Sequence, residues 1–394
     1  MLLNKLGEYM KFVHLGDLHI GKSLGEFDLI SDQKYIIDQV FDLIIREKVD
    51  AVLIAGDIYD RAIPSEAATR LLDYFLHKLS TSRVKTFIIS GNHDSDERLA
   101  FGSAMFEASD IYISSIYDGS MKKYTVEDEY GEICIHLLPF VKASQVRHFY
   151  ENAKIESYDD AVRVVIENSD IDSAKRNILV AHQFVTAGEY DPDLGGSEGV
   201  GVQSVGLVEK ISYENFNDFD YVALGHIHSA QRVGRDEVRY SGSPLKYSLS
   251  EVNNTKVVPI ITLGPKGEVK IEEYTLKPKR DMRHLRGNLE ELLAKNNINN
   301  TEDFIYATLT NEDIIDDAMS IFQQIYPNTV KIDYDNSHTK EIENVDISNI
   351  TENKTFSEVI SEFYTLMYNC DISEEEMEIM KQVAKEAGLI DETN

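Results

Sequence analysis

The sequence predicts an α/β protein with a layered core. In its first part, short apolar runs of strand length alternate with longer amphipathic stretches of helical length, which is the pattern of layered α/β folds. The chain has 394 residues, enough for two or three domains. Its hydrophobic fraction of 42% is typical of a folded globular protein.

The elements of the first part follow in order along the chain. Apolar runs predict strands at 11–15, 51–55 and 87–90, and amphipathic stretches predict helices at 31–48 and 65–79. The second of these helices begins with a serine that follows a proline, and we expect this serine to cap it.

After Gly131 the balance shifts towards strands, with helices expected between 143 and 169. The glycine-rich, acidic segment 188–206 is expected to be a long surface loop near the functional site, because structureless loops of this length usually carry function or move. The further strands of the same domain are expected at 133–138, 178–181, 221–224, 238–241, 257–263 and 269–275.

We expect three domains, at 10–275, 276–340 and 341–394. The first boundary is placed at the basic, proline-containing segment 277–286. A small α/β unit should follow it, with a helix near 289–295, a strand at 304–309, a helix at 313–326 and a strand at 329–334. The end of the chain predicts two amphipathic helices between 355 and 388, separated near 371–373.

Composition and charge limit the classes of function that the chain can have. The formal charge of −30 argues against a uniformly basic nucleic-acid binder, so any action on DNA needs local basic patches, metal ions or a partner. No apolar run approaches the roughly 20 residues of a membrane helix, and no signal peptide is recognised. Cys134 and Cys370 form no CxxC pair, which fits a reducing compartment, and we expect a cytoplasmic protein.

Five short segments carry the chemistry, and each follows an apolar strand. Strand ends in layered α/β folds are where loops gather functional groups, and a glycine beside a ligand lets the backbone turn sharply. The segments are Gly16-Asp17-Leu18-His19, Gly56-Asp57, Gly91-Asn92-His93-Asp94, Ala181-His182 and Gly225-His226-Ile227-His228.

The residue types in these segments indicate a metal site. In an extended chain residues i and i+2 point the same way, so both members of an Asp-x-His or His-x-His pair can reach one ion. Carboxylate, imidazole and amide donors together suit Mn²⁺, Fe²⁺ or Zn²⁺ better than Mg²⁺ or Ca²⁺. Taken singly, each segment could be a turn or a hydrogen-bonded core histidine. The full set in this order is far more specific than its parts.

In order and spacing, these motifs resemble the calcineurin-like metallophosphoesterase family. Within it, the segments GDLHIG, GDIYDRAIPS, SGNHDS, VAHQF, ALGHIHSAQ and YSGSPL are similar to those of bacterial nuclease subunits that work with an ATPase in DNA repair. The phosphoesterase motifs cover Asp17 to His228. The resemblance implies a layered β-sandwich flanked by helices, with a small α/β capping domain and C-terminal helices.

The resemblance also implies roles at the site. Two divalent metal ions per chain are expected, with Mn²⁺ first and Fe²⁺ or Zn²⁺ as alternatives. His93 would contact the scissile phosphate without being a ligand, and Asp60 stands where some relatives carry a second histidine near the substrate. One ion would be held by Asp17, His19 and His228, the other by Asn92, His182 and His226, with Asp57 bridging the two.

Two further sets of residues are expected to bind partners. Basic residues of the boundary segment suit contact with the phosphate backbone, and a solvated linker is the alternative; they are Lys277, Lys279, Arg280, Arg283 and Arg286. Near the C-terminus an apolar stripe at near-helical spacing could pack on this chain or on a partner; it consists of Phe356, Val359, Ile360, Phe363 and Met367.

The leading functional prediction is a DNA nuclease subunit. The resemblance implies 3′–5′ exonuclease action on double-stranded ends and endonuclease action on hairpins or single strands. It also implies an ATPase partner and a homodimer within a heterotetramer. From Asn336 the chain holds 14 acidic and 4 basic residues, a net of −10, so this part cannot bind DNA by charge alone. A small-molecule phosphodiesterase or nucleotidase and a non-catalytic assembly module are the alternatives.

Overall fold

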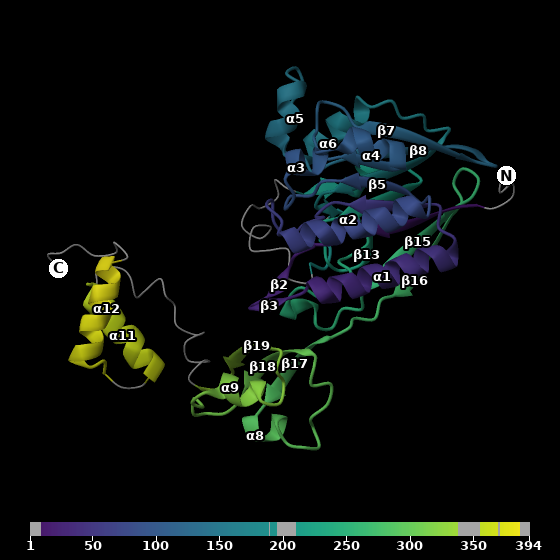
Figure 1. The fold of residues 1–394 in the computed structure, drawn as a ribbon. Helices are drawn as coiled ribbons and strands as arrows, with labels where there is room; N and C mark the ends of the chain where they lie inside the picture. Colours follow the sequence, from purple (N-terminus) through teal and green to yellow (C-terminus); the bar gives the residue numbers. More distant parts are fainter. Residues whose placement is uncertain (1–8, 189, 195–209, 338–354, 369–370, 387–394) are drawn as a thin grey trace. The chain divides into compact units, whose positions relative to one another are not determined.

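The computed structural model describes residues 9–188, 190–194, 210–337, 355–368 and 371–386 (Figure 1). The chain separates into two compact units, Met1–Met282 and Arg283–Asn394. The expected loop at 188–206 lies mostly outside the described residues, as does Cys370.

The first unit is built on two six-stranded sheets. The first has the order β16-β15-β1-β4-β5-β6 and the second the order β13-β14-β12-β9-β8-β7. The first sheet consists of β1 (Met10–Leu15), β4 (Ala51–Ala55), β5 (Lys85–Ile89), β6 (Ile111–Ser114), β15 (Val257–Leu263) and β16 (Val269–Thr275). The second consists of β7 (Lys122–Asp128), β8 (Gly131–Leu138), β9 (Arg176–His182), β12 (Tyr221–Gly225), β13 (Gln231–Val233) and β14 (Arg235–Tyr240).

The central strands of each sheet are parallel. β1, β4, β5 and β6 run the same way in the first sheet, and β8, β9, β12 and β14 do so in the second. Antiparallel strands β15, β16, β7 and β13 complete the edges. Within each sheet the carboxyl ends of the parallel strands therefore meet at one edge, which is where such folds place ligands.

The two sheets pack face to face over an apolar core. Strands that cross this core are hydrophobic along their length because side chains on both faces are covered. Fully buried residues from both sheets meet there, among them Phe12, Phe87, Leu137, Tyr221 and Ile261. Cys134 of β8 is a buried free thiol, as the sequence predicts.

Helices cover the outer faces, so the β-sandwich flanked by helices is confirmed. α1 (Ile30–Glu47) and α2 (Glu66–Thr81) lie side by side over the first sheet (Figure 1). The side chain of Ser65 caps α2 by accepting a hydrogen bond of 3.2 Å from the amide of Ala68. α5 (Ala143–Phe149) and α6 (Tyr158–Glu167) pack on the second sheet. Shorter elements are α3 (Asp96–Ala100), α4 (Ser103–Phe106), β2 (Ser23–Leu24), β3 (Phe27–Asp28), β10 (Val185–Thr186) and β11 (Ile211–Ser212).

The second unit begins with a three-stranded sheet of order β17-β18-β19, followed by two helices near the C-terminus. Its small core includes Ile305, Phe322 and Tyr326. Its elements are β17 (Met282–Gly287), α8 (Leu289–Leu292), β18 (Phe304–Leu309), α9 (Ala318–Gln323), β19 (Thr329–Tyr334), α11 (Phe356–Tyr368) and α12 (Glu374–Glu386).

One prediction for this unit needs correction. The helix expected at 313–326 spans only Ala318–Gln323, because the amide of Ile315 donates to the hydroxyl of Tyr334 and Asp317 has a left-handed backbone with φ 54°. The last part of the basic segment 277–286 lies in β17, which begins at Met282. Among the described residues, no helix combines the length and apolar character needed to span a bilayer.

Candidate metal centre

The ends of five strands bring the predicted site residues together. Three of these strands, β1, β4 and β5, belong to the first sheet, and β9 and β12 belong to the second. The site therefore forms where the carboxyl edges of the two sheets meet. Asp17 and His19 follow β1, Asp57 follows β4, Asn92 and His93 follow β5, His182 ends β9, and His226 and His228 follow β12.

The backbone at these strand ends is strained. A left-handed backbone costs an L-residue about 1–2 kcal/mol and is kept only when its surroundings enforce it. Glycine is required beside the ligands, since a Cβ on Gly225 would lie 1.9 Å from the carbonyl oxygen of Ala55. Four of the site residues have positive φ: Asp17 (51°), His19 (42°), Asp57 (49°) and His226 (96°).

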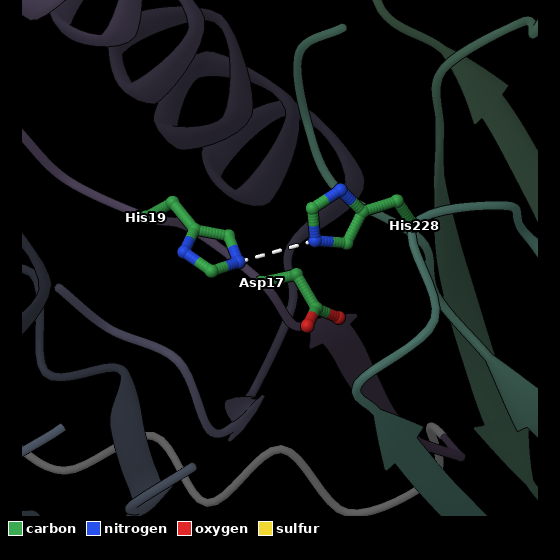
Figure 2. Close-up of side chains that lie close together, drawn as sticks. All are labelled: Asp17, His19 and His228. Carbon is green, nitrogen blue, oxygen red and sulfur yellow. Dashed lines mark hydrogen bonds between the residues drawn. The ribbon is translucent and has the colours of Figure 1, made fainter. Parts of the chain in front are cut away.

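One group of ligand atoms is formed by Asp17, His19 and His228, all buried (Figure 2). The Nε2 atoms of His19 and His228 lie 3.1 Å apart. The carboxylate of Asp17 accepts hydrogen bonds of 2.9 and 3.1 Å from the amide of His226, which holds it at this position. Each side chain offers one ligand atom, and these atoms lie within 4.8 Å of one another.

A second group surrounds Asn92 and His182. The Nε2 atom of His182 lies 3.1 Å from Oδ1 of Asn92, and Nδ1 of His226 lies 3.0 Å from the same oxygen. His182 Nδ1 donates to the carbonyl of Ala55 at 2.7 Å. Because a carbonyl can only accept, this bond fixes the proton on Nδ1 and leaves Nε2 of the neutral ring as the ligand atom.

Asp57 lies between these two groups. Its Oδ2 is 3.6 Å from Nε2 of His19 and 3.4 Å from Nε2 of His182. Its Oδ1 accepts a 2.9 Å hydrogen bond from the amide of His93. One carboxylate thus reaches histidines of both groups, as a shared ligand must.

Burial and mutual charge shift the protonation of these groups. Burial raises the pKa of Asp57, but the imidazoles of His182 and His19 outweigh it and hold the pKa well below the ordinary range. Burial lowers the pKa of His19 far below its usual value. Burial, together with the charge of Asp57, raises the pKa of Asp17 to about 6 against the opposing effect of His182 and His228. An ionised Asp57 and a neutral His19 are the forms that bind metal.

His93 differs from the other histidines because it is exposed. Its side chain is 42% accessible, and its Nε2 lies 4.0 Å from Oδ2 of Asp57. Its Nδ1 donates to the backbone carbonyl of Asp60 at 3.1 Å. This bond turns Nε2 away from Asp60 and leaves it as the atom that can meet a substrate. His93 is also close enough to His19 and Asp57 to complete a further group able to hold an ion.

Two supporting residues were missed by the sequence reasoning. Asp94 accepts hydrogen bonds from the amides of Ile58, Tyr59 and Gly91 and so orders the loop that carries His93. Glu251 is fully buried, with one oxygen 3.4 Å from Nδ1 of His228. Asp94 is the last residue of the predicted segment Gly91-Asn92-His93-Asp94, so only its supporting role was missed, whereas nothing in the local sequence distinguishes Glu251.

A buried cation accompanies Glu251. Lys256 donates to the carboxylate of Glu251, to Oγ of Ser243 at 2.8 Å and to the carbonyl of His228 at 2.9 Å. Burial raises the pKa of Glu251, but His228 and Lys256 outweigh it and hold the pKa at about 2. An ionised carboxylate behind a ligating imidazole orients the ring and raises its basicity.

The predicted DNA-contact residues are engaged within the protein. Arg280 pairs with the buried Asp32, Arg283 with Asp303 and Arg286 with Asp335. Lys277 hydrogen-bonds with Gln39 through its backbone, and Lys279 Nζ lies 3.5 Å from Oγ of Ser31. Ion pairing of the three arginines reduces the positive charge that this segment offers to DNA.

The predicted apolar stripe lies on α11. Phe356, Val359 and Ile360 are half-buried and Phe363 is 48% exposed, while the side chain of Met367 lies outside what is described. The neighbouring helix α12 adds apolar side chains that the sequence reasoning did not single out, with Ile379 61% and Val383 55% exposed.

Comparisons with known proteins agree with this arrangement. Residues 10–230 match the family model described as calcineurin-like phosphoesterase, and residues 278–368 match that described as type 5 capsule protein repressor C-terminal domain. The chain is 31% identical over 383 residues to SbcD of the nuclease SbcCD from Staphylococcus epidermidis, a match that covers 95% of this chain and 98% of that protein.

One solved structure with a partial likeness is GAP50, the anchor in the inner membrane complex of Plasmodium. Its TM-score is 0.40 and its sequence identity 13%, and the match covers 83% of this chain and 97% of that one. A dimetal phosphatase from Danio rerio has a TM-score of 0.38 and 12% identity, covering 69% of this chain and 99% of that one. The buried cluster of histidines and aspartates fits divalent metal binding. By its motifs, its sandwich fold and its match over nearly the whole chain, this protein belongs to the calcineurin-like phosphoesterase family and, within it, to the SbcD family of nucleases.

Proposed function

We propose that this protein is the DNA nuclease subunit of an SbcCD-type complex and hydrolyses phosphodiester bonds at a two-metal centre. The observation that carries the proposal is the meeting of two ligand groups around Asp57, with His93 exposed beside them. The exposed side chain of His93 suits contact with a substrate, which a purely structural metal site does not need, so the geometry favours an enzyme over a non-catalytic module.

The donor set fits divalent cations on the chemistry of its atoms. The Nε2 atoms of His19 and His228 face each other at 3.1 Å, and no hydrogen-bond partner is found for the buried Nδ1 of His19 among the described residues. Two neutral imidazoles cannot both direct lone pairs at each other favourably, whereas a cation between them satisfies both. Asp17, His19 and His228 would hold one ion, and Asn92, His182 and His226 the other, with Asp57 shared.

The ions, Mn²⁺ first among the candidates, would supply charge neutralisation of the phosphate and a water of lowered pKa as nucleophile. The protein's own part falls to His93. Because its Nδ1 proton is committed to the Asp60 carbonyl, His93 must carry a second proton on Nε2 to act as an acid. That proton would pass to the leaving oxygen as negative charge develops on it.

The surroundings of His93 suit a phosphate substrate. Lys22 pairs with Asp60 at 2.8 Å, and Arg61, with its side chain 80% exposed, lies beside the same carboxylate. These two cations share one carboxylate, so a net positive charge remains beside His93 on a chain of net charge −30, which is what DNA binding requires here. Exonuclease action 3′–5′ on double-stranded ends and endonuclease action on hairpins belong to this proposal.

An ATPase subunit is the proposed partner of the C-terminal helices. Ile379, Met380 and Val383 of α12 are 61%, 38% and 55% exposed. They lie within one turn on an otherwise acidic helix, at spacings that share a face. Such a stripe fits a groove or coiled-coil surface of another protein.

A second copy of the chain is the proposed occupant of another apolar surface, so that two nuclease subunits pair within a heterotetramer. Phe101, Met105 and Phe106, which are close in sequence, are 86%, 79% and 38% exposed in the first unit. Phe101 and Phe106 also line a groove of about 340 Å³ beside α2 and β6. Apolar surface of this kind usually marks an interface.

The test is a Mn²⁺-dependent cleavage assay on the full chain, with hairpin DNA and a chromogenic phosphodiester as parallel substrates. The proposal expects cleavage of hairpin DNA, loss of activity with a chelator, and stimulation on double-stranded ends by the ATPase subunit. Cleavage of the small phosphodiester alone, with DNA intact, would favour a small-molecule phosphodiesterase. No hydrolysis of either substrate in wild-type protein shown to bind Mn²⁺ would contradict the proposal.

A further inference from the structure

A buried side chain of α1 holds the ligand segment between Asp17 and Gly21. Gln33 is 3% exposed, and its Nε2 donates to the carbonyl of His19 at 2.7 Å and reaches that of Leu18 at 3.4 Å. Its Oε1 accepts a 2.9 Å hydrogen bond from the amide of Gly21. One amide side chain thus binds backbone groups on both sides of His19.

Tyr247, more than 200 residues further along the chain, supports the same segment. Its hydroxyl donates to the carbonyl of Leu18 at 2.5 Å and lies 3.2 Å from Nε2 of Gln33. Its ring stands edge-on to the rings of His19 and His228, with centroids 5.7 and 6.0 Å away. Gln33 and Tyr247 hydrogen-bond to the backbone carbonyls and amide of this segment, so both support the segment through its backbone.

The residues next to these two are tied to the segment that leads into the second unit. Asp32 adjoins Gln33 and is 1% exposed. Its two carboxylate oxygens accept hydrogen bonds from two nitrogens of the Arg280 guanidinium, with Nε 3.0 Å from Oδ1. Lys246 adjoins Tyr247 and pairs with Asp281 at 2.9 Å. Arg280 and Asp281, two consecutive residues of one segment, therefore contact the residues next to both supports, Asp32 beside Gln33 and Lys246 beside Tyr247.

We propose that Gln33 and Tyr247 are positioning residues for the Asp17–His19 segment and that Arg280 and Asp281 couple them to the segment joining the two units. The left-handed backbone at Asp17 and His19 is costly and persists only while surrounding bonds enforce it. Loosening Gln33 would let the segment relax and would move its ligand atoms apart. In this assignment Arg280 serves the metal centre and not a DNA phosphate.

Coupling of this kind is reciprocal. If the joining segment affects metal affinity, bound metal must stabilise the joining segment by the same free energy. The amide of Lys277 donates to Gln39 at 2.9 Å, so hydrogen exchange at this amide reports on how firmly the segment is held. The inference rests on the proposed metal centre and adds residues that the centre's ligand set does not contain.

The test measures Mn²⁺ affinity of the full chain by electron paramagnetic resonance of the free ion, alongside the thermal midpoint. Gln33→Leu and Arg280→Gln should each raise the dissociation constant about tenfold, as loss of an outer-shell partner commonly does. In the double variant, the dissociation constant should rise by less than the product of the two single increases, because both substitutions weaken the same support of the ligand segment. Arg280→Lys, which keeps a charge for Asp32, should recover part of the affinity.

Arg176→Gln is the matched control. Arg176 likewise pairs through its guanidinium with a largely buried carboxylate, that of Asp128, in the same unit, but it is the first residue of β9, at the end opposite to His182. It should lower the thermal midpoint and leave the dissociation constant unchanged. An equal loss of affinity in this control, or an unchanged constant in either Gln33→Leu or Arg280→Gln, would overturn the proposal.

Hydrogen exchange on wild-type protein covers the case in which a variant fails to fold. Mn²⁺ should slow exchange of the Lys277 amide, and unchanged exchange at saturating Mn²⁺ would also overturn the proposal. A wild-type chain that binds no Mn²⁺ at all is a different result, since it contradicts the proposed function itself.

Discussion

The metal centre and the C-terminal helix pair depart from the usual distribution of polar and apolar side chains in opposite directions. The centre buries charged or titratable groups, with Asp17, Asp57 and His182 at most 2% exposed. On α11 and α12, Phe363 and Ile379 are apolar and 48% and 61% exposed. Each arrangement costs free energy in the isolated chain, one by desolvating charge and the other by wetting hydrocarbon.

The difference indicates what each region binds. Buried carboxylates and imidazoles are stabilised by cations, and exposed aliphatic side chains are stabilised by another apolar surface. Substitutions in the metal centre should therefore affect hydrolysis without affecting partner binding, and substitutions on α12 should do the reverse.

The largest expected effect belongs to His93. His93→Gln should lower the cleavage rate by about 10²–10⁴-fold, the usual contribution of a general acid, while the metal content stays near wild type. Rates under saturating Mn²⁺ and metal content by mass spectrometry are the measurements. His148→Gln, which changes an exposed histidine of α5, is the control. Loss of bound metal in His93→Gln would make His93 a ligand instead.

Asp57 should affect both ions, whereas Asp17 should affect one. Asp57→Asn removes the carboxylate that reaches His19 and His182, so both dissociation constants should rise by more than the roughly 10–100-fold typical of outer-shell changes. Asp17→Asn should weaken mainly the ion held with His228. Calorimetric titration with Mn²⁺ distinguishes the two variants. Two ions retained at full affinity in Asp57→Asn would rule out a shared ligand.

Without metal, the stability of the protein should fall as the pH rises from 6.5 to 9. Burial lowers the pKa of His182, but Asp57 outweighs it and raises the pKa to about 9. The folded chain then keeps a proton that the unfolded chain loses, so this stabilisation is full below pH 6.5 and disappears by about pH 9. The loss is at most about 3 kcal/mol.

Thermal unfolding of chelator-treated protein across this pH range measures the effect. Asp17, with a pKa raised to about 6, titrates mostly below this window, whereas Asp94, with a pKa raised to about 7 by burial and the charge of Asp57, adds a loss of the same sign at its lower end. His182→Gln should flatten the profile, and Mn²⁺ should flatten it too because the ligand form of imidazole is neutral. Stability that stays level in the metal-free wild type would contradict the charge pairing.

The smallest expected effect concerns assembly. Ile379→Ser should weaken binding to the ATPase subunit by about 1–2 kcal/mol, as truncation of an interface residue often does, and leave Mn²⁺-dependent hydrolysis intact. Ile314→Ser changes an equally exposed isoleucine of the same unit and serves as control. Pull-down with the partner is the measurement. Equal binding by the two variants would move the interface away from α12.

The sequence predicted which residues would come together at this site because each follows a strand whose pattern is easy to recognise. It predicted the sandwich strands for the same reason, since β4 and β12 are apolar along their length. β6 and β7 were not predicted. β7 alternates exposed lysines and acids with few buried positions, so its sequence does not resemble that of a buried strand.

Supporting residues were harder to predict than ligands. Gln33 lies on an amphipathic helix whose sequence gives no sign that this polar side chain is buried. Glu251 lies 23 residues from His228 in the sequence. Their contacts form only when distant segments of the chain pack together, so no local sequence pattern predicts them. The pairing of Arg280 with Asp32, 248 residues apart, likewise cannot be read from a basic run of sequence.

The proposed ligands come from both layers of the sandwich, with Asp17, His19 and Asp57 following strands of one sheet and His182 and His228 belonging to the other. A cation shared by these residues would act as a cross-link between the layers, much as a disulfide joins two segments. The concentration of free metal ion would then determine both the nuclease activity and the stability of the packing between the two layers. Chelation should loosen this edge of the sandwich first, while the separate core around Phe322 and Tyr326 remains folded.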